Sequence, residues 1–442
     1  MKKGVTMEKT TRGLFLAWML ISLVLLGCGS SQVDDSSFEA DLSFRESITV
    51  GDPESNPSGP YLVTSKNNEV LVSWTEENID GEGRNVLIAT VTSDGRQLDE
   101  IRQMNHEPSG SRGGEHKAKF TLGEDDAISS LFIAFTDIYK HRVMKSTFAN
   151  GGGPFSSELR LNDDQGELVN RDGKEVSRAN FTAIGTAPGG KVYVAWLDGR
   201  NDLEAKEVFM AVSEDGGRSF SKNYPISALA CPCCRPEIDF LDGGKSMVVT
   251  YRDNGSPSAD GVADNVRNHL MIRSNDGGQT FGDPVVISDD GWTSKGCPHA
   301  GISIAVDSED RIHAIWWTGG RTPDEAGIYY TYSEDGGKSF GPRQFISDAP
   351  ADRVLHTEVT VDKNDTVYVA WENVKEDKSR IFLAHRSVSK GEWSPIYQVS
   401  GGTWSTFYPM LTTDDKSLYV SWTERNDESS QIRLQTSPLA GS

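Results

Sequence analysis

A strand-like segment ending in an aromatic residue occurs seven times along the chain, and this repeat constrains the fold more than any other feature. The segments are rich in β-branched and apolar residues, and glycine- and aspartate-containing turns flank them without helical periodicity. Their aromatic residues, 51 to 65 positions apart, are Trp74, Phe135, Trp196, Tyr251, Trp316, Trp371 and Trp422. Units of this kind bury their hydrophobic faces only against neighbouring units.

The repeat predicts an all-β protein, a β-propeller of four-stranded antiparallel blades. We favour seven blades, with six as the alternative if one unit is irregular. The seventh unit contains only three strands, because its third strand at 432–437 is followed by five residues. The strand-like segment 46–51 near the other end of the domain is expected to supply the missing fourth strand and close the ring.

Three turns between third and fourth strands share the pattern S-x-D-x-G-x-x-F, at 213–220, 274–281 and 333–340. The aspartates, Asp215, Asp276 and Asp335, can accept backbone N–H bonds within the turn, and the glycine suits a positive φ. The pattern resembles the Asp-box, or BNR repeat, of the sialidase superfamily. That resemblance covers nearly the whole chain after the leader and implies a structural role for these aspartates, on the face opposite an active site.

The first 27 residues resemble a lipoprotein signal peptide. A basic start precedes an apolar run that ends in Leu25-Leu26-Gly27-Cys28. This resembles a bacterial lipobox, which implies lipidation of Cys28, a membrane anchor and a place in the cell envelope, on the periplasmic or surface side. The expected organisation is a signal peptide at 1–27, a tether at 28–43 and a propeller at 44–442. An ordinary secretory signal or a single anchor helix is the alternative.

Charge narrows the range of partners. The chain has 442 residues and a formal net charge of −21, and no cluster of Lys or Arg follows the leader. We therefore expect no nucleic-acid partner. A monomer that binds a glycan or another small ligand is expected instead.

Strand parity places the short turns on one face of the propeller and the long, irregular loops on the other, where functional residues are expected. Five of the seven positions that lie two residues after the aromatic anchors are acidic. A ring of carboxylates there would attract cations such as Ca²⁺ or sugar hydroxyls, whereas the alternative is that each residue only caps its strand. The five are Glu76, Asp137, Asp198, Asp253 and Glu424.

Polar residues also recur where successive inner strands begin, at the top of the expected central channel. Together they predict a polar pocket. They are His116, Arg178, Arg235, His299, His356 and Tyr408.

The resemblance to sialidases implies an arginine cluster, a tyrosine nucleophile assisted by a glutamate, and an acidic general acid/base. Arg178 and Arg235 are the candidate clamps, and Tyr408 is the candidate nucleophile with Glu358 or Glu424 as its base. Asp198 and Asp253 complete the candidate catalytic set. The sequence departs from the family, because Phe44-Arg45-Glu46-Ser47 lacks the Arg-Ile-Pro pattern and catalytic sialidases have six blades.

Four cysteines lie in two neighbouring loops: Cys231, Cys233 and Cys234 in one, and Cys297 in the next. In an oxidising compartment they favour two disulfides, for example one inside 231–234 and one to Cys297, although the sequence does not fix the connectivity. Alternatively the thiolates, with His299, could bind a soft metal, Cu(I) or Zn(II), and His116 or His356 could join. No paired C-x-x-C of a zinc ribbon is present.

Three functions remain open at this point. The first is a glycan-directed protein, either a divergent glycoside hydrolase or a carbohydrate binder. The second is a metal-handling or redox protein that uses the Cys and His loops. The third is a scaffold for another envelope protein.

Overall fold

The computed structural model describes residues 42–78, 83–111, 114–134, 143–164, 179–201, 206–227, 229–255, 266–294, 299–351, 353, 355–388 and 391–440. By its contacts the chain divides after Glu39, and the second unit is Ala40–Ser442. The described residues all belong to the second unit, and the expected lipidation site Cys28 lies outside them.

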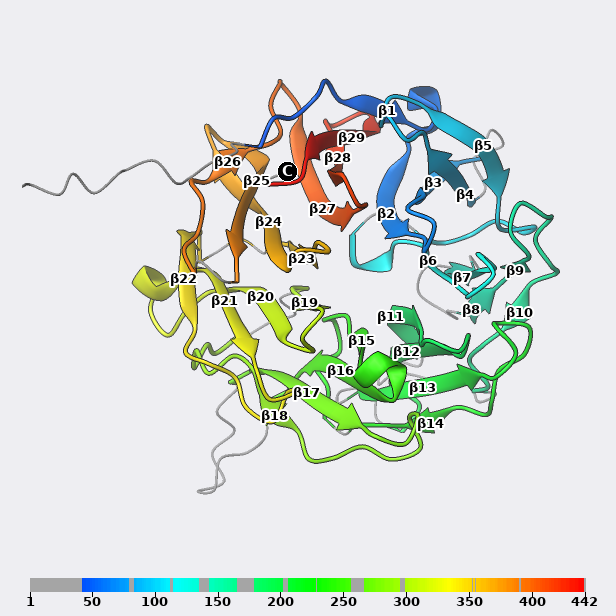
Figure 1. Cartoon of the computed structure of the whole chain (residues 1–442), viewed down its shortest axis with the longest axis horizontal. Coiled ribbons are helices and arrows are strands. Elements are labelled where there is room, and N and C mark those ends of the chain that lie inside the picture. The colour runs from blue at the N-terminus through cyan, green and yellow to red at the C-terminus, as the bar shows by residue number, and fades with distance from the viewer. Residues whose placement is uncertain are drawn as a thin grey trace, which may run out of the picture. The chain divides into compact units, whose positions relative to one another are not determined.

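The second unit is a propeller of seven antiparallel sheets, which confirms the expected fold and the favoured blade count (Figure 1). Blade 1 contains β2 (Ser58–Thr64), β3 (Val70–Glu77), β4 (Arg84–Val91) and β5 (Leu98–Gln103); blade 2 contains β6 (Lys119–Leu122), β7 (Ile128–Ala134), β8 (Val143–Ser146), β9 (Phe148–Ala149) and β10 (Leu159–Arg160). Blade 3 contains β11 (Ala179–Thr186), β12 (Val192–Asp198), β13 (Glu207–Ser213) and β14 (Tyr224–Pro225); blade 4 contains β15 (Glu237–Leu241), β16 (Ser246–Arg252), β17 (His269–Ser274) and β18 (Val285–Val286).

The remaining blades follow the same order. Blade 5 contains β19 (Ser303–Val306), β20 (Ile312–Thr318), β21 (Gly327–Ser333) and β22 (Gln344–Asp348); blade 6 contains β23 (Thr357–Val361), β24 (Thr366–Lys375), β25 (Lys378–Ser387) and β26 (Tyr397–Gln398). Blade 7 combines β27 (Ser405–Thr413), β28 (Ser417–Arg425) and β29 (Ser430–Pro438) with β1 (Ile48–Val50). The short 3₁₀ helices are η1 (Pro53–Ser55), η2 (Gly114–His116), η3 (Asp242–Gly244) and η4 (Pro323–Glu325).

The N-terminal strand closes the ring as the sequence predicts. β1 pairs antiparallel with β29, and Val50 lies opposite Ile432. Val50 is fully buried in a core cluster that also contains Trp74 of blade 1 and Leu434 of blade 7. Segments from the two ends of the domain therefore share one sheet and one core.

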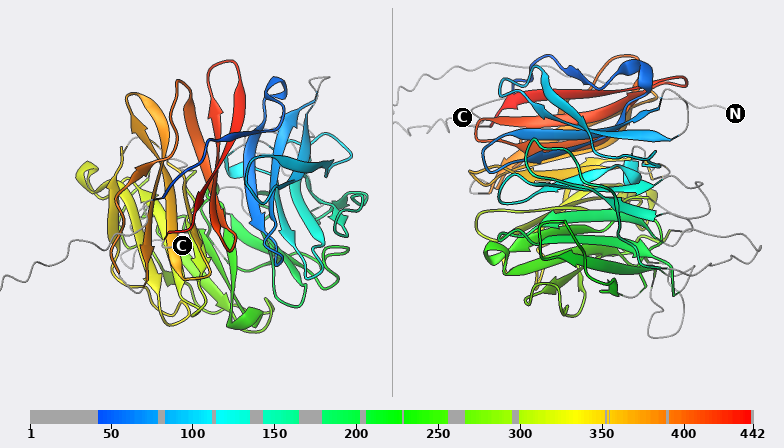
Figure 2. Two further views of the ribbon diagram at one scale, coloured as in Figure 1. Left: turned by 45° about the horizontal axis from the view of Figure 1, so that its top comes forward. Right: turned by 90° about the vertical axis from the view of Figure 1, so that its right-hand side faces the viewer.

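Adjacent blades pack face to face (Figure 2), and core clusters combine hydrophobic side chains from neighbouring blades. Each described anchor aromatic is at most 2% exposed: Trp74, Trp196, Tyr251, Trp316, Trp371 and Trp422. Phe135, the seventh anchor, lies outside the described residues. No helix within the described ranges is long and apolar enough to cross a membrane.

The three S-x-D-x-G-x-x-F turns follow the third strands of blades 3 to 5 and form the expected internal bonds. In blade 4, Asp276 Oδ1 accepts hydrogen bonds from the Ser274 hydroxyl at 2.8 Å and the Thr280 N–H at 2.9 Å. The Thr280 hydroxyl donates to Oδ2, and this bond first, together with the other two, lowers the pKa of Asp276 to about 2. Ser219 and Ser339 N–H groups donate likewise to Asp215 and Asp335, at 2.8 and 3.0 Å. The three aspartates therefore have a structural role, because they hold the hairpin turns together.

Candidate functional site

A cavity of about 460 Å³ opens on the loop-rich face, where inner strands begin and second strands end. The S-x-D-x-G-x-x-F turns lie at the opposite ends of the strands, as strand parity predicts. The structure brings four of the sequence-predicted pocket residues together here, His116, His299, His356 and Tyr408. The other lining residues are Arg353, Leu355, Glu372, Val374, Ser379, Phe407 and Arg425. We call this the mouth cavity.

A carboxylate organises one wall of the mouth cavity. Glu372 is 2% exposed, and its Oε1 lies 3.0 Å from His356 Nδ1. The same oxygen accepts the backbone N–H of Tyr408. The Tyr408 ring is 4.5 Å from the His356 ring, edge to face. Glu372 thus fixes the orientation of the His356 imidazole and of the Tyr408 backbone. The imidazole and the Tyr408 phenol beside it are groups that can hold or transfer a proton.

Three inner strands carry irregularities close to where they begin. The pairing register shifts between Ser58 and Tyr61 in β2, between Asn180 and Thr182 in β11, and between Phe407 and Met410 in β27. Bulges re-aim side chains, and they are common next to functional sites. In β11 and β27 the irregularity contains a residue with positive φ, Phe181 at 51° and Tyr408 at 59°.

Positive φ is uncommon for aromatic residues and concentrates where a site requires it. His299 also has a positive φ, of 49°. The Phe181 ring lies between two histidines of the cavity, with centroids 4.5 Å from His116 and 5.7 Å from His299. The backbone is therefore held in a strained form at three aromatic side chains in or against the mouth cavity.

Below the mouth cavity, charged side chains pair with each other in the channel. Arg235 is 4% exposed, and it forms ion pairs with Glu237 at 2.5 Å and with Glu358 at 3.6 Å. Burial raises the pKa of Glu358 to about 7. Arg235 and Glu358 line a small cavity of about 10 Å³ together with His356 and Tyr408 of the mouth cavity. Arg235 and Glu358 therefore lie in a layer beneath the mouth cavity.

The acidic residues after the anchor tryptophans act as strand caps. Glu76, Asp198 and Glu424 accept the indole N–H of Trp74, Trp196 and Trp422, at 2.7, 2.8 and 3.0 Å. Asp198 also accepts from Arg200 at 2.8 Å, and Glu424 accepts from Gln431 at 2.8 Å. These carboxylates point at protein donors, so the expected carboxylate ring does not form among them. Asp253 pairs through its backbone with Ala230.

The sequence did not predict Glu372 as a site residue; it predicted Glu358 or Glu424 as the base that assists Tyr408. Glu372 immediately follows the anchor Trp371, so alternation along the strand directs it to the other face of the blade. The dipeptide Trp-Glu at an anchor was a signal that could have identified it. Arg353, Phe407 and Arg425 had no comparable signal. Asp137, Arg178 and Cys297 lie outside the described residues.

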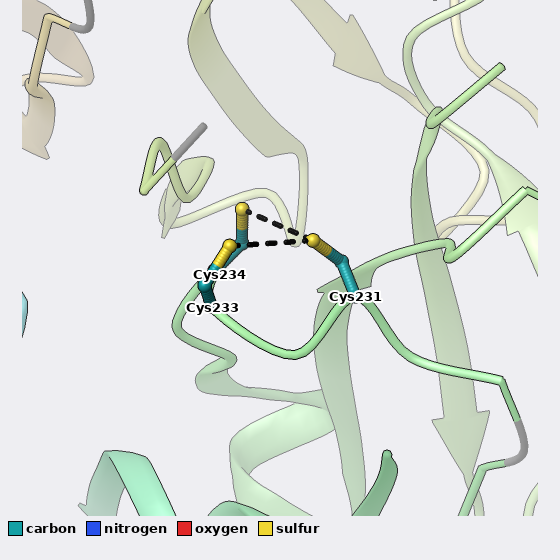
Figure 3. A group of neighbouring side chains, drawn as sticks. All are labelled: Cys231, Cys233 and Cys234. Atoms are coloured by element: carbon teal, nitrogen blue, oxygen red, sulfur yellow. Dashed lines mark hydrogen bonds between the residues drawn. The ribbon is translucent and has the colours of Figure 1, made fainter. Parts of the chain in front are cut away.

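Three buried thiols form a cluster in the loop between β14 and β15 (Figure 3). Cys231 Sγ lies 3.7 Å from the sulfurs of Cys233 and Cys234. A disulfide requires about 2.0 Å, so the expected bond within 231–234 is absent among these described cysteines. The sulfurs of all three converge instead of forming one pair. Thiol–thiol hydrogen bonds, from Cys233 first, lower the pKa of Cys231, while burial raises the pKa of Cys234.

No protein-family model matches the sequence, and no curated protein sequence does either. Among solved structures, the chain is similar to the polysaccharide lyase Uly1, with 13% identity, a TM-score of 0.53, and coverage of 91% of this chain and 94% of that one. This likeness supports the propeller fold alone.

Sialidases also appear among the structural neighbours. The intramolecular trans-sialidase of Ruminococcus gnavus has 12% identity and a TM-score of 0.45, over 89% of this chain and 96% of its own. The NanB sialidase of Streptococcus pneumoniae, as a K499G mutant, has 13% identity and a TM-score of 0.47, over 90% and 70%. At these TM-scores the likeness carries no conclusion about the site.

Proposed function

We propose that the protein is a glycan-directed propeller that binds a carboxylate-bearing sugar in the mouth cavity. The observation that carries the proposal is the composition of this one cavity. It combines aromatic faces, Phe407 and Tyr408, with two guanidinium groups, Arg353 and Arg425, and three histidines. Its volume of about 460 Å³ suits a ligand of one or two sugar rings.

The charge of the cavity supports an acidic ligand. The chain as a whole has a formal net charge of −21, yet the mouth cavity has two arginines against one carboxylate, Glu372. That carboxylate is already engaged by His356 and the Tyr408 backbone. Guanidinium groups bind carboxylates through paired hydrogen bonds. Arg425 also packs over the Phe407 ring at 4.5 Å, which places a cation next to an aromatic face.

The Glu372–His356 pair, with Tyr408 beside it, supplies groups able to accept and donate a proton at a bound sugar. This arrangement differs from the sialidase-like set expected from the sequence, since the carboxylate that accepts the Tyr408 backbone N–H is that of Glu372. Among the structural neighbours, proteins named as sialidases, a polysaccharide lyase and an arabinofuranosidase act on glycans. Their likeness to this chain extends to the fold only.

Calorimetric titration with acidic oligosaccharides, sialyllactose and oligogalacturonate, and with neutral lactose tests the proposal. We expect an acidic ligand to bind, with Arg425→Gln weakening its affinity by about 10-fold, which corresponds to about 1.4 kcal/mol. Arg96→Gln is the matched control, because Arg96 lies in the β4–β5 turn on the opposite face and is exposed. Equal affinity for neutral and acidic ligands, or equal effects of the two variants, would contradict the proposal. Assay of new reducing ends in the same mixtures decides whether binding leads to cleavage.

We further propose that Cys28 carries a lipid that anchors the protein in the bacterial envelope. The basic start, the apolar run and the Leu-Leu-Gly-Cys sequence support this. Cys28→Ala should move the protein from the detergent phase to the aqueous phase or leave it unprocessed. An unchanged mature mass together with unchanged partitioning would count against lipidation.

A further inference from the structure

The cysteine cluster lies apart from the proposed sugar site and has the geometry of a metal site. The three Sγ atoms lie within 4.8 Å of one another, and Cys231, Cys233 and Cys234 are at most 3% exposed. An ion 2.3 Å from each sulfur would hold two sulfurs about 3.8 Å apart in a tetrahedral site and about 4.0 Å apart in a trigonal one. Cys231 Sγ lies 3.7 Å from each of the other two sulfurs. Little movement is therefore needed to bind an ion.

The backbone holds the cluster in place. Ala230 N–H donates to the carbonyl of Lys206 at 2.6 Å, and Cys231 N–H donates to that of Arg252 at 2.7 Å. The loop is thus fixed to the ends of β13 in blade 3 and β16 in blade 4. The thiols also belong to a buried cluster with Phe181, whose ring contacts His116 and His299. Such rigid placement preorganises ligands for an ion.

Two arginines balance the charge of bound thiolates. Arg267 Nη1 donates to Cys231 Sγ at 3.4 Å. The second is Arg252, the last residue of β16, whose carbonyl accepts the Cys231 N–H. Its guanidinium donates to the carbonyls of Arg267 and Ala300 at 3.1 and 3.0 Å. Three thiolates and one monovalent cation have a net charge of −2, which these two guanidinium groups offset.

We propose that Cys231, Cys233 and Cys234 bind one Cu(I) ion through three thiolates. Soft thiolates select Cu(I), which accepts three sulfur ligands, whereas structural zinc requires four. Binding replaces three S–H bonds by three Cu–S bonds and releases three protons to solvent, and no electron is transferred. The ion would fasten the loop between blades 3 and 4, directly before Arg235 of the channel.

The test uses the whole chain in detergent, isolated anaerobically, and titrated with Cu(I) against bathocuproine disulfonate as competing chelator. We expect about one equivalent of Cu(I), and an X-ray absorption spectrum with sulfur as the only nearest neighbour. Cys233→Ser and Cys234→Ser should each weaken Cu(I) binding by at least about 100-fold. Met271→Leu is the matched control, because it removes a buried sulfur from blade 4 outside the thiol cluster, and it should not change the affinity.

The spectrum of the unsubstituted protein keeps the test decisive if a serine variant fails to fold. A nitrogen or oxygen coordination shell, retention of zinc in preference to Cu(I), or equal losses in Met271→Leu would overturn the proposal. So would a disulfide among these cysteines in protein isolated with its thiols blocked. Glycan binding is measured separately, so failure of either proposal leaves the other standing.

Discussion

Single carboxylates in this propeller have sharply different roles according to what surrounds them. Asp198, 1% exposed, accepts the Trp196 indole N–H and hydrogen bonds from Arg200, so its charge is matched by donors. Among the described residues, Asp239 in β15 accepts hydrogen bonds from the backbone N–H groups of Phe240 and Val306 alone, at 2.8 and 3.0 Å, and burial raises its pKa to about 7. The same residue type is therefore a cap in one place and an unfavourable charge in another.

The pKa of Asp239 predicts a pH-dependent stability. Because its pKa is raised above the ordinary value of 3.8, Asp239 contributes stability at low pH that is lost as pH rises from about 4 through about 7. We expect Asp239→Asn to remove this part of the pH dependence, so that the thermal midpoint of the variant falls less between pH 4.5 and pH 7.5 than that of the unsubstituted protein. Midpoints by circular dichroism across this range provide the measurement. Parallel profiles for both proteins would show that Asp239 ionises normally.

At the scale of elements, the S-x-D-x-G-x-x-F turns connect neighbouring blades as well as closing their own hairpins. The Ser129 hydroxyl of β7 donates to the carbonyl of Gly216 in the turn of blade 3 at 2.9 Å. Gly217, with φ of 96°, approaches so closely that a Cβ there would lie 2.1 Å from the Ser129 Oγ. This glycine meets two demands, a left-handed backbone and a close contact between blades.

Two glycines with the same φ allow the effect of the backbone to be separated from the effect of the close contact. Gly189 has the same φ of 96° as Gly217, and no atom lies within 4 Å of a Cβ built there. We expect Gly189→Ala to destabilise the protein by about 1 kcal/mol through φ alone, and Gly217→Ala by about 2 to 4 kcal/mol through φ and overpacking. Urea unfolding midpoints of the two variants measure the difference. Equal losses would mean that the contact between blades yields without strain.

These elements also show which features can be predicted from a sequence. The hairpin turn, its aspartate and the positive φ of its glycine follow from local chemistry, and all were predicted. The bulges at Phe181 and Tyr408 were not, because their residues are ordinary and the irregularity depends on packing around the channel. The carboxylate that binds the Tyr408 backbone could not be predicted either, because Glu372 belongs to the preceding blade and reaches Tyr408 across the interface between blades.

At the scale of the whole molecule, the channel is a result of ring closure. The mouth cavity takes residues from η2, β24, β25, β27 and β28 and from the loops before β19 and β23. No single blade contains it, so its geometry depends on every interface between blades. The sequence predicted the face and the histidines, because both follow from strand order. It did not predict the pairing of Arg235 with Glu358, because this pairing brings the loop before β15 in blade 4 to β23 in blade 6.

Ring closure through β1 therefore controls both the stability and the site. Val50 is fully buried between blades 7 and 1, where an aspartate would be a charge without a partner. We expect Val50→Asp to lower the free energy of unfolding by more than about 3 kcal/mol and to weaken ligand binding at the mouth cavity as the ring loosens. Ile101→Asp is the control, because Ile101 is 56% exposed on β5, and it should shift the free energy by less than about 0.5 kcal/mol. Urea unfolding combined with limited proteolysis measures both effects. If Val50→Asp matches Ile101→Asp in both assays, the ring holds together without β1, and the interfaces of the other blades must maintain the cavity.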